Sequence, residues 1–430
     1  MTLSRTAEIR AVALQDPARA ETMLTAFLND LFAIRTEGMK INADQYSLNS
    51  LNGFFTCEHG PCFFKFHQEE GEEEMHGELY RADILARAGL PVDQPILSST
   101  LTGDQVLVYR RRNDPRFSDV LRELDLAPDP AAMSRALAAE AELNAKLLQV
   151  ARDTLHTIRP AQSRAEPIHR LFHERLVNPT TGAYPAGRLA SFYVDKDFSL
   201  PGVSLPWKDL AHATLRLNGR QYAHTLAELF DAAHERLLPE RLADAGGIVA
   251  HGDAHNANVW YERGEDADHL AFFDPAFAGE DVPALLAEVK STFHNTLAHP
   301  LWLYDSPMVP DRWHVTADYT DGVLSLTTDW HIGTLREKLL DVKASSYWRP
   351  WLQTLQDHEL LPADWERVIR LALFLCPTLV MNLRAGAEGG RHNPQSAGIG
   401  LIQAVTCGSV PVDGQDHMTR FFDSIRPTRP

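Results

Sequence analysis

The stretch HGDAHNANVW, residues 251–260, decides how the rest of this sequence is interpreted. It follows the apolar residues 248–250, which predict a buried strand. Within eight positions it then places two histidines, one aspartate and two asparagines, namely His251, Asp253, His255, Asn256 and Asn258. Side chains of these types bind metal ions, orient hydroxyl groups and transfer protons. The stretch therefore predicts a chemically active loop directly after a strand.

Length and composition predict a folded protein with room for two lobes. The chain has 430 residues, of which 44% are hydrophobic, so it can bury one large core or two moderate ones. Its formal net charge of −17 argues against a nucleic-acid partner, because affinity for nucleic acid comes largely from Lys and Arg side chains that neutralise phosphates. We expect a small-molecule partner instead, while the oligomeric state stays open.

The cellular setting is predicted from what the sequence lacks. No apolar run approaches the length of about 20 residues that a membrane span needs. No signal-like segment opens the chain, and the four cysteines (Cys57, Cys62, Cys376 and Cys407) show neither CxxC spacing nor a Cys/His ligand pattern. We expect a reduced, cytoplasmic protein without a membrane segment.

The order of hydrophobic patterns predicts an α+β fold with two lobes. Residues 1–36 have helical periodicity and form an amino-terminal extension. Residues 37–112 predict a small antiparallel sheet with one helix, including a hairpin whose turn is EHGP, residues 58–61. Residues 113–430 predict a larger, mainly helical lobe, with an insertion at about 159–245 and helices from Asp274 to the end.

The spacing of polar residues around the opening stretch is typical of phosphoryl transfer. That chemistry needs a carboxylate that orients the acceptor hydroxyl and takes its proton, and two oxygen ligands for Mg²⁺. Asp253 fits the first role, and Asn258 and Asp274 fit the second. Upstream, Lys65 lies in a predicted strand and Glu78 in the following helix, where a lysine would bind the nucleotide phosphates and a glutamate would hold the lysine.

At this point the sequence resembles the aminoglycoside phosphotransferase and choline kinase family, which has the protein-kinase-like fold. HGDAHNANVW (251–260) is similar to the family's HGDxHxxN catalytic loop, and FFDPAFAG (272–279) resembles its metal-binding Asp segment. ELYRADILARAGLPV (78–92) is similar to its Glu-bearing helix, which selects Glu78. The resemblance spans roughly residues 45–288 and implies ATP or GTP with Mg²⁺ as cofactors and a hydroxyl-bearing small molecule as acceptor.

The resemblance also implies the nucleotide contacts. The loop that covers the phosphates is expected around SLNSLNGFF (47–55), which has one glycine, so Ser47, Ser50 and Asn52 would take part in the cover. The segment Val108, Tyr109 and Arg110 is expected to be the hinge that binds the adenine edge. Pro275 follows Asp274 where protein kinases have Phe-Gly, which argues against a flipping activation segment.

Several alternatives stay open at this stage. His251 and His255 can act in the loop or only hold its shape by hydrogen bonds. A metal-dependent hydrolase would use His251, Asp253, His255 and Asp274 as ligands but would leave Lys65 and Glu78 without a role. A non-catalytic nucleotide-binding protein of the same fold is the third possibility. The acceptor is expected to be a sugar-like, aminocyclitol or amino-alcohol metabolite, and the acidic residues Glu280, Asp281 and Glu288 favour one that carries an amine.

Overall fold

The amino-terminal residues form two helices. In the computed structural model, which describes residues 4–42, 50–67, 81–99, 101, 103–299 and 301–428, these helices are α1 (Arg5–Ala13) and α2 (Pro17–Phe32). Helix α2 begins where the Asp16 side chain accepts a hydrogen bond from the Arg19 backbone N–H and Pro17 occupies the first turn. It ends at Phe32, and the capping residue Ala33 that follows has a left-handed φ of 52°.

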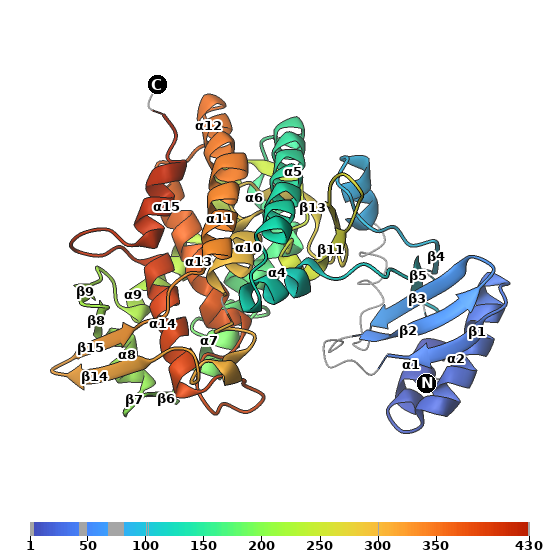
Figure 1. Cartoon of the computed structure of the whole chain (residues 1–430), viewed down its shortest axis with the longest axis horizontal. Coiled ribbons are helices and arrows are strands. Elements are labelled where there is room, and N and C mark those ends of the chain that lie inside the picture. The colour runs from blue at the N-terminus through green and yellow to red at the C-terminus, as the bar shows by residue number, and fades with distance from the viewer. Residues whose placement is uncertain are drawn as a thin grey trace. The chain divides into compact units, whose positions relative to one another are not determined.

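The chain divides into two compact units, and the helices α1 and α2 belong to the first. Unit 1 contains residues up to Asp114 together with Ala271–Ala276, and unit 2 contains Pro115–Leu270 and Phe277–Pro430. In Figure 1 the elements of unit 1 up to Asp114 run from blue to teal, the segment Ala271–Ala276 is yellow, and the elements of unit 2 run from green to red. The segment that carries Asp274 therefore belongs to unit 1, although its flanks belong to unit 2.

Unit 1 is built on a five-stranded antiparallel sheet in the order β1-β2-β3-β5-β4. Its strands are β1 (Glu37–Ile41), β2 (Ser50–Cys57), β3 (Gly60–His67), β4 (Leu97–Ser99) and β5 (Val106–Arg110), and residues 81–87 are helical. The predicted hairpin is confirmed, because β2 and β3 pair from Ser50↔His67 to Cys57↔Gly60. Helix α2 packs Leu24, Phe27 and Leu28 into the same core as Phe55 and Phe64 of the sheet.

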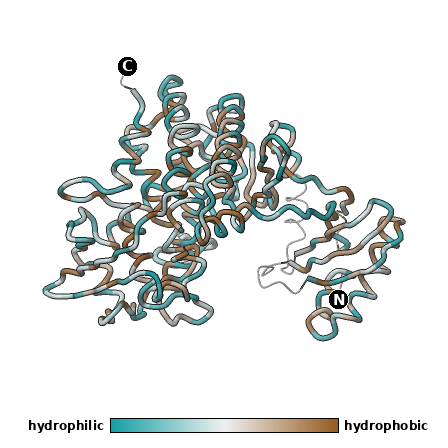
Figure 2. The backbone as a smooth tube through the Cα atoms, viewed as in Figure 1, coloured by the Kyte–Doolittle hydropathy of each residue, from teal (hydrophilic) through white to brown (hydrophobic). Residues whose placement is uncertain are grey.

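Unit 2 is mainly helical, as predicted. Its α-helices are α4 (Phe117–Leu126), α5 (Pro130–Thr154), α6 (Pro160–Ala165), α7 (Gly187–Phe192), α8 (Trp207–His212), α9 (Leu226–Arg236), α10 (Val289–Thr292), α11 (Thr334–Lys343), α12 (Arg349–Asp357), α13 (Trp365–Val380), α14 (Pro394–Gly408) and α15 (His417–Ile425). Helices α11 and α12 follow each other end to end and run alongside α5 (Figure 1). In Figure 2 many helices of this unit alternate between brown and teal, as expected where one face is buried.

Short strands and turns connect these helices. The strands are β6 (Asp197–Leu200), β7 (Val203–Pro206), β8 (Thr214–Leu217), β9 (Arg220–Gln221), β10 (Gly247–Ala250), β11 (Val259–Glu262), β12 (His269–Phe272), β13 (Gly279–Pro283), β14 (Val315–Thr320) and β15 (Val323–Thr328). The 3₁₀ turns are η1 (Pro167–Leu171), η2 (His173–Arg175), η3 (Arg241–Ala245), η4 (Asn256–Asn258) and η6 (Ser306–Met308), and two π-helical turns are η5 (Phe293–Leu297) and η7 (Ala344–Trp348).

The prediction of helices alone after Asp274 is wrong. Strands β14 and β15 form a hairpin, and β15 pairs in parallel with β8, giving a four-stranded sheet in the order β14-β15-β8-β9. The hairpin sequence alternates buried and more exposed residues, with Leu324 and Leu326 fully buried. This period of two is the pattern of a half-buried strand, and the turn Asp321-Gly322 has positive φ at both residues.

Candidate active site

Asp253 lies in a loop whose shape depends on Gly252. Strand β10, which pairs with β13, ends directly before His251. The loop that follows leads to the 3₁₀ turn η4. Gly252 has φ +76°, and a Cβ atom there would lie 2.5 Å from the backbone oxygen of Phe277. A side chain at this position would be both strained and in collision, so the glycine of the motif is required by the backbone.

The neighbouring polar side chains of the motif hold this loop in place. His251 is fully buried, and its Nδ1 accepts a hydrogen bond from the Asp253 backbone N–H at 3.3 Å. His255 Nδ1 accepts from the Ala257 N–H, and Asn258 Nδ2 donates to the Asp253 backbone oxygen at 3.0 Å. None of the described residues donates a hydrogen bond to Asn258 Oδ1. The Asn258 amide group is therefore oriented through its nitrogen, while its oxygen can still accept.

The Asp253 carboxylate faces basic groups within unit 2. Its Oδ1 lies 3.5 Å from Lys290 Nζ, and its Oδ2 lies 3.8 Å from His255 Nε2. Burial alone would raise the pKa of Asp253, but Lys290, His255, His251 and Arg175 together hold it below its usual range. The side chain is thus ionised at neutral pH, which is the state a proton acceptor needs.

This arrangement extends from Lys290 to His294 and Tyr304, and none of these three residues was predicted from the sequence. Lys290 Nζ donates to His294 Nε2 at 3.0 Å, and His294 Nδ1 lies 2.5 Å from Tyr304 Oη. Burial, followed by the Lys290 charge, puts the pKa of His294 well below its ordinary value, so this imidazole is neutral and can accept from Lys290. Burial also lowers the pKa of Lys290 against the opposing effect of Asp253.

The sequence signal for these residues is a mostly polar run, and the structure shows that this run lies in a buried helix. Residues 288–296, EVKSTFHNT, are all buried. Lys290 and His294 are four positions apart, and the π-helical turn η5 begins at Phe293. Such turns occur frequently at functional sites.

In unit 1 the structure brings Lys65 and Asp274 together. They are 209 positions apart in sequence, and Lys65 Nζ donates to Asp274 Oδ1 at 2.9 Å. Lys65 lies on the central strand β3, where it pairs with Asn52 of β2 and Leu107 of β5. Phe64 beside it is fully buried in the core, so the alternation of the strand directs Lys65 to the opposite face.

Backbone contacts within unit 1 fix the position of Asp274. The Phe272 N–H donates to the Pro91 oxygen, and the Asp93 N–H donates to the Phe272 oxygen. Asp274 itself has a φ of 54°, a left-handed conformation that is uncommon outside glycine and often marks a functional position. Its side chain is 43% exposed, and Oδ2 accepts no hydrogen bond from the described residues.

The structure describes some of the remaining predicted nucleotide contacts but not others. Asn52 lies in β2 and is buried, with its Oδ1 accepting from Asn42 Nδ2, so from Ser50 onward the predicted loop is strand. Val108 is fully buried, and its backbone oxygen accepts from the Ile96 N–H. Tyr109 and Arg110 end β5 and pair with Phe63 and Cys62 of β3. Ser47, Glu78 and the Ser50 side chain lie outside the described residues.

The acidic residues that favoured an amine-bearing acceptor have other partners. Asp281 binds His156 Nε2 at 2.7 Å and Gln162. Glu288 is buried and accepts from Lys343 Nζ at 2.9 Å and from Ser291. Two of the three carboxylates that favoured an amine-bearing acceptor are therefore already paired within unit 2.

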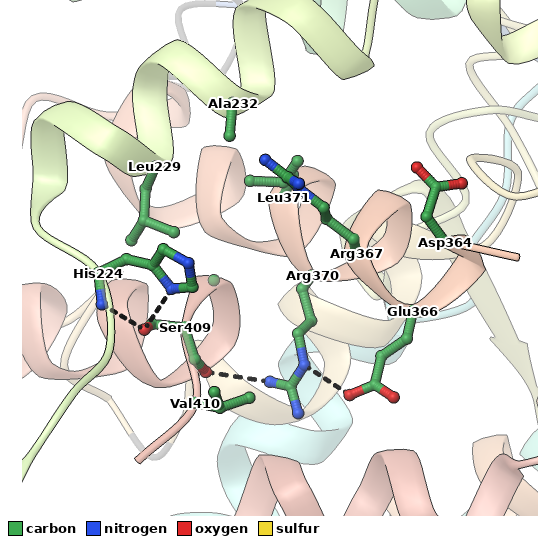
Figure 3. Close-up of a pocket in the computed structure, with 11 residues that line it drawn as sticks. His224, Leu229, Ala232, Asp364, Glu366, Arg367, Arg370, Leu371, Ser409 and Val410 are labelled. Carbon is green, nitrogen blue, oxygen red and sulfur yellow. Dashed lines mark hydrogen bonds and ion pairs between the residues drawn. The ribbon is translucent and has the colours of Figure 1, made fainter. Parts of the chain in front are cut away.

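A separate cavity of about 400 Å³ lies elsewhere in unit 2. Residues of α9, of α13 and of the end of α14 line it, and Arg370 spans it to the Ser409 oxygen while Glu366 accepts from the Arg370 side chain (Figure 3). None of the residues predicted for the site lines this cavity.

Among the described residues no three His, Cys, Asp or Glu side chains are grouped so that they could hold a metal ion. Within the same residues, none of the helices combines the length and the apolar character that crossing a membrane requires.

Comparison with known proteins gives matches among solved structures only. No family model matches the chain, and no curated protein matches it. A macrolide 2'-phosphotransferase type I matches with 13% identity and a TM-score of 0.43, over 89% of this chain and 96% of that chain. An ethanolamine kinase from Plasmodium vivax matches with 11% identity and a TM-score of 0.40, over 93% of both chains. A macrolide 2'-phosphotransferase from Brachybacterium faecium matches with 12% identity and a TM-score of 0.39, over 89% of this chain and 98% of that chain. The chain is thus similar, at low identity, to proteins named as small-molecule phosphotransferases and a kinase.

Proposed function

We propose that this protein is a small-molecule kinase that transfers the γ-phosphoryl group of ATP or GTP to a hydroxyl group of a metabolite. The observation that carries the proposal is the 2.9 Å ion pair between Lys65 and Asp274. A strand lysine and an aspartate 209 positions later in the sequence meet within one unit, as a nucleotide and metal site requires. A hydrolase that used only the residues around Asp253 would assign no function to Lys65.

In this proposal Asp253 is the catalytic base. Its ionised carboxylate accepts the proton of the acceptor hydroxyl while the hydroxyl oxygen attacks the γ-phosphorus. The bond between the γ-phosphorus and the β–γ bridging oxygen breaks, and the nucleoside diphosphate leaves. Oδ2 is the oxygen assigned to this proton, since Oδ1 is buried against Lys290. Lys290 Nζ lies 3.5 Å from Oδ1.

Asn258 and Asp274 would hold Mg²⁺, which neutralises charge on the nucleotide phosphates when it is bound. Both side chains present an oxygen that accepts no hydrogen bond from the described residues, and oxygen is the ligand atom that Mg²⁺ prefers. Lys65 would contact the α- and β-phosphates, with Glu78 holding the lysine. The segment 108–110 is proposed to bind the adenine edge, and His251 and His255 to keep the loop in shape.

An ADP-release screen tests this function. The full-length protein is incubated with ATP or GTP and Mg²⁺, against a panel of sugars, sugar acids, amino alcohols, aminoglycosides and nucleosides. We expect acceptor-dependent ADP release that Asp274→Ala abolishes by removing metal-dependent nucleotide binding. Nucleotide binding that does not depend on Mg²⁺, or a hydrolytic activity that needs Zn²⁺ and no nucleotide, would contradict the proposal.

A further inference from the structure

We propose that Cys57 and Cys62 are a redox-active pair of thiols, which a peroxide converts into a disulfide bond at the end of the β2–β3 hairpin. Both cysteines lie in unit 1. They are five positions apart, which is not the CxxC spacing of redox motifs, so only the fold brings the two sulfur atoms together. This inference does not depend on the proposed function, because it involves neither the catalytic loop nor the binding of a nucleotide.

The first observation is that the two sulfur atoms are in contact, with 3.6 Å between Cys57 Sγ and Cys62 Sγ. The strand register explains this contact, because Phe55 pairs with Cys62 and Cys57 pairs with Gly60. Residues two positions apart on a strand lie on the same face, so Cys57 is the diagonal neighbour of Cys62 on one face of the hairpin. A disulfide bond is about 2.05 Å long, so side-chain rotations that shorten the distance by about 1.5 Å close the bond.

The second observation is that the two thiols differ in access to solvent. Cys57 is half-buried, whereas Cys62 is fully buried in the core of unit 1. Gly60, which pairs with Cys57, has no side chain, and a Cβ atom there would find no heavy atom within 4 Å, so the space opposite Cys57 is open. Burial raises the pKa of the Cys62 thiol to about 12, so this thiol keeps its proton at neutral pH. A small oxidant therefore reaches Cys57 first.

The reaction removes two electrons from the two thiols. The Cys57 thiolate attacks one oxygen of hydrogen peroxide, the O–O bond breaks, and hydroxide leaves, which gives a sulfenic acid at Cys57. The Cys62 sulfur then attacks the Cys57 sulfur, the S–O bond breaks, and the oxygen leaves as water with the Cys62 proton. The hydroxide takes up the proton that Cys57 lost, so one peroxide molecule is reduced to two water molecules. A dithiol reductant reverses the reaction by thiol–disulfide exchange.

The two cysteines of unit 2 serve as an internal comparison. Cys376 in α13 and Cys407 in α14 are both buried, with exposed fractions of 1% and 0%. Cys376 Sγ donates to the Ala372 backbone oxygen instead of contacting a second sulfur atom. Because solvent does not reach either thiol, both are expected to stay reduced when the Cys57–Cys62 pair is oxidised.

Disulfide mapping of the full-length protein tests the inference. The native protein is treated with hydrogen peroxide at a dose that oxidises free cysteine to cystine. Remaining thiols are then alkylated after unfolding, and the peptides are analysed by mass spectrometry. We expect a disulfide within the peptide that contains Cys57 and Cys62, and full alkylation of Cys376 and Cys407. Dithiothreitol should restore all four thiols.

Variants test the order of the two steps. Cys62→Ala removes the second sulfur, so the sulfenic acid at Cys57 should persist and react with dimedone at least about tenfold more than in the wild type. Cys57→Ser should form no disulfide, whereas Cys407→Ala is the matched control and should still form it. Circular dichroism checks that each variant is folded. Four free thiols in the treated wild type, a disulfide between two copies of the chain, or equal dimedone labelling of wild type and Cys62→Ala would overturn the inference.

Discussion

At the scale of single residues, the geometry around Asp253 gives its two carboxylate oxygens different environments. Oδ1 is buried against Lys290, whereas Oδ2 lies toward His255. Asp253 and Asn258 could be predicted from sequence because they belong to one local motif. Lys290 could not be assigned a role in this way, because only the packing of a distant segment brings it to this carboxylate. The same holds for His294, which contacts Lys290.

Replacing the carboxylate tests its role as a base. Asp253→Asn keeps the shape of the side chain but removes the proton acceptor, so kcat should fall at least about 100-fold. Nucleotide affinity should stay within a few fold, because the residue is proposed to face the acceptor. Steady-state kinetics and calorimetry measure the two quantities. The variant Asp266→Asn, at an exposed position of the same unit, is the control, and turnover of Asp253→Asn within tenfold of wild type would refute the assignment.

At the scale of elements, Asp268 connects the segment after the catalytic loop to helix α5. Arg135 of α5 donates to both Asp268 carboxylate oxygens, at 2.9 and 2.5 Å, and the Tyr261 hydroxyl of β11 also donates to this carboxylate. The hydrogen bond from Arg135, with further ones from Tyr261 and Gly264, holds the pKa of Asp268 well below its usual range. This connection was not predicted, because its members are 133 and seven positions apart and show no motif.

The lowered pKa predicts how stability depends on pH. Because the folded-state pKa of Asp268 lies below the unfolded value of about 3.9, its contribution is present above pH of about 4 and is lost as the pH falls toward the folded-state value. Asp268→Asn should therefore lower the urea midpoint at pH 7, and the difference from wild type should shrink at pH 3. Asp266→Asn should show no such difference. A gap that stays constant from pH 7 to pH 3 would mean that the charge of Asp268 does not matter.

At the scale of the whole molecule, the sequence predicted the α+β class, the antiparallel sheet of unit 1 and the helical character of unit 2. These features follow from local periodicity and from turn residues, so they are visible in one sequence. The pairing of β15 with β8 was not predicted, because a parallel contact between strands about 110 residues apart leaves no local pattern. The meeting of Lys65 and Asp274 was implied only by the resemblance and by the order of the motifs.

The division into two units predicts that nucleotide binding and acceptor chemistry can be separated by mutation. Lys65 and Asp274 belong to unit 1, whereas Asp253 and Lys290 belong to unit 2. If Lys65 binds the phosphates and Glu78 holds Lys65, both act as one functional group. Lys65→Ala should then weaken nucleotide binding or turnover at least tenfold, or about 1.4 kcal/mol, through loss of a charge-assisted contact.

A double-mutant cycle on kcat/KM for the nucleotide measures this dependence. The variant that combines Lys65→Ala with Glu78→Ala should lose much less than the sum of the two single losses, because either change alone already disables the pair. Lys40→Ala on β1 removes a lysine whose side chain is 74% exposed, so it is the matched control and should leave kcat/KM unchanged. Circular dichroism checks that each variant is folded. Small and strictly additive losses would show that Lys65 and Glu78 act independently, and unit 1 would then need another residue to bind the phosphates.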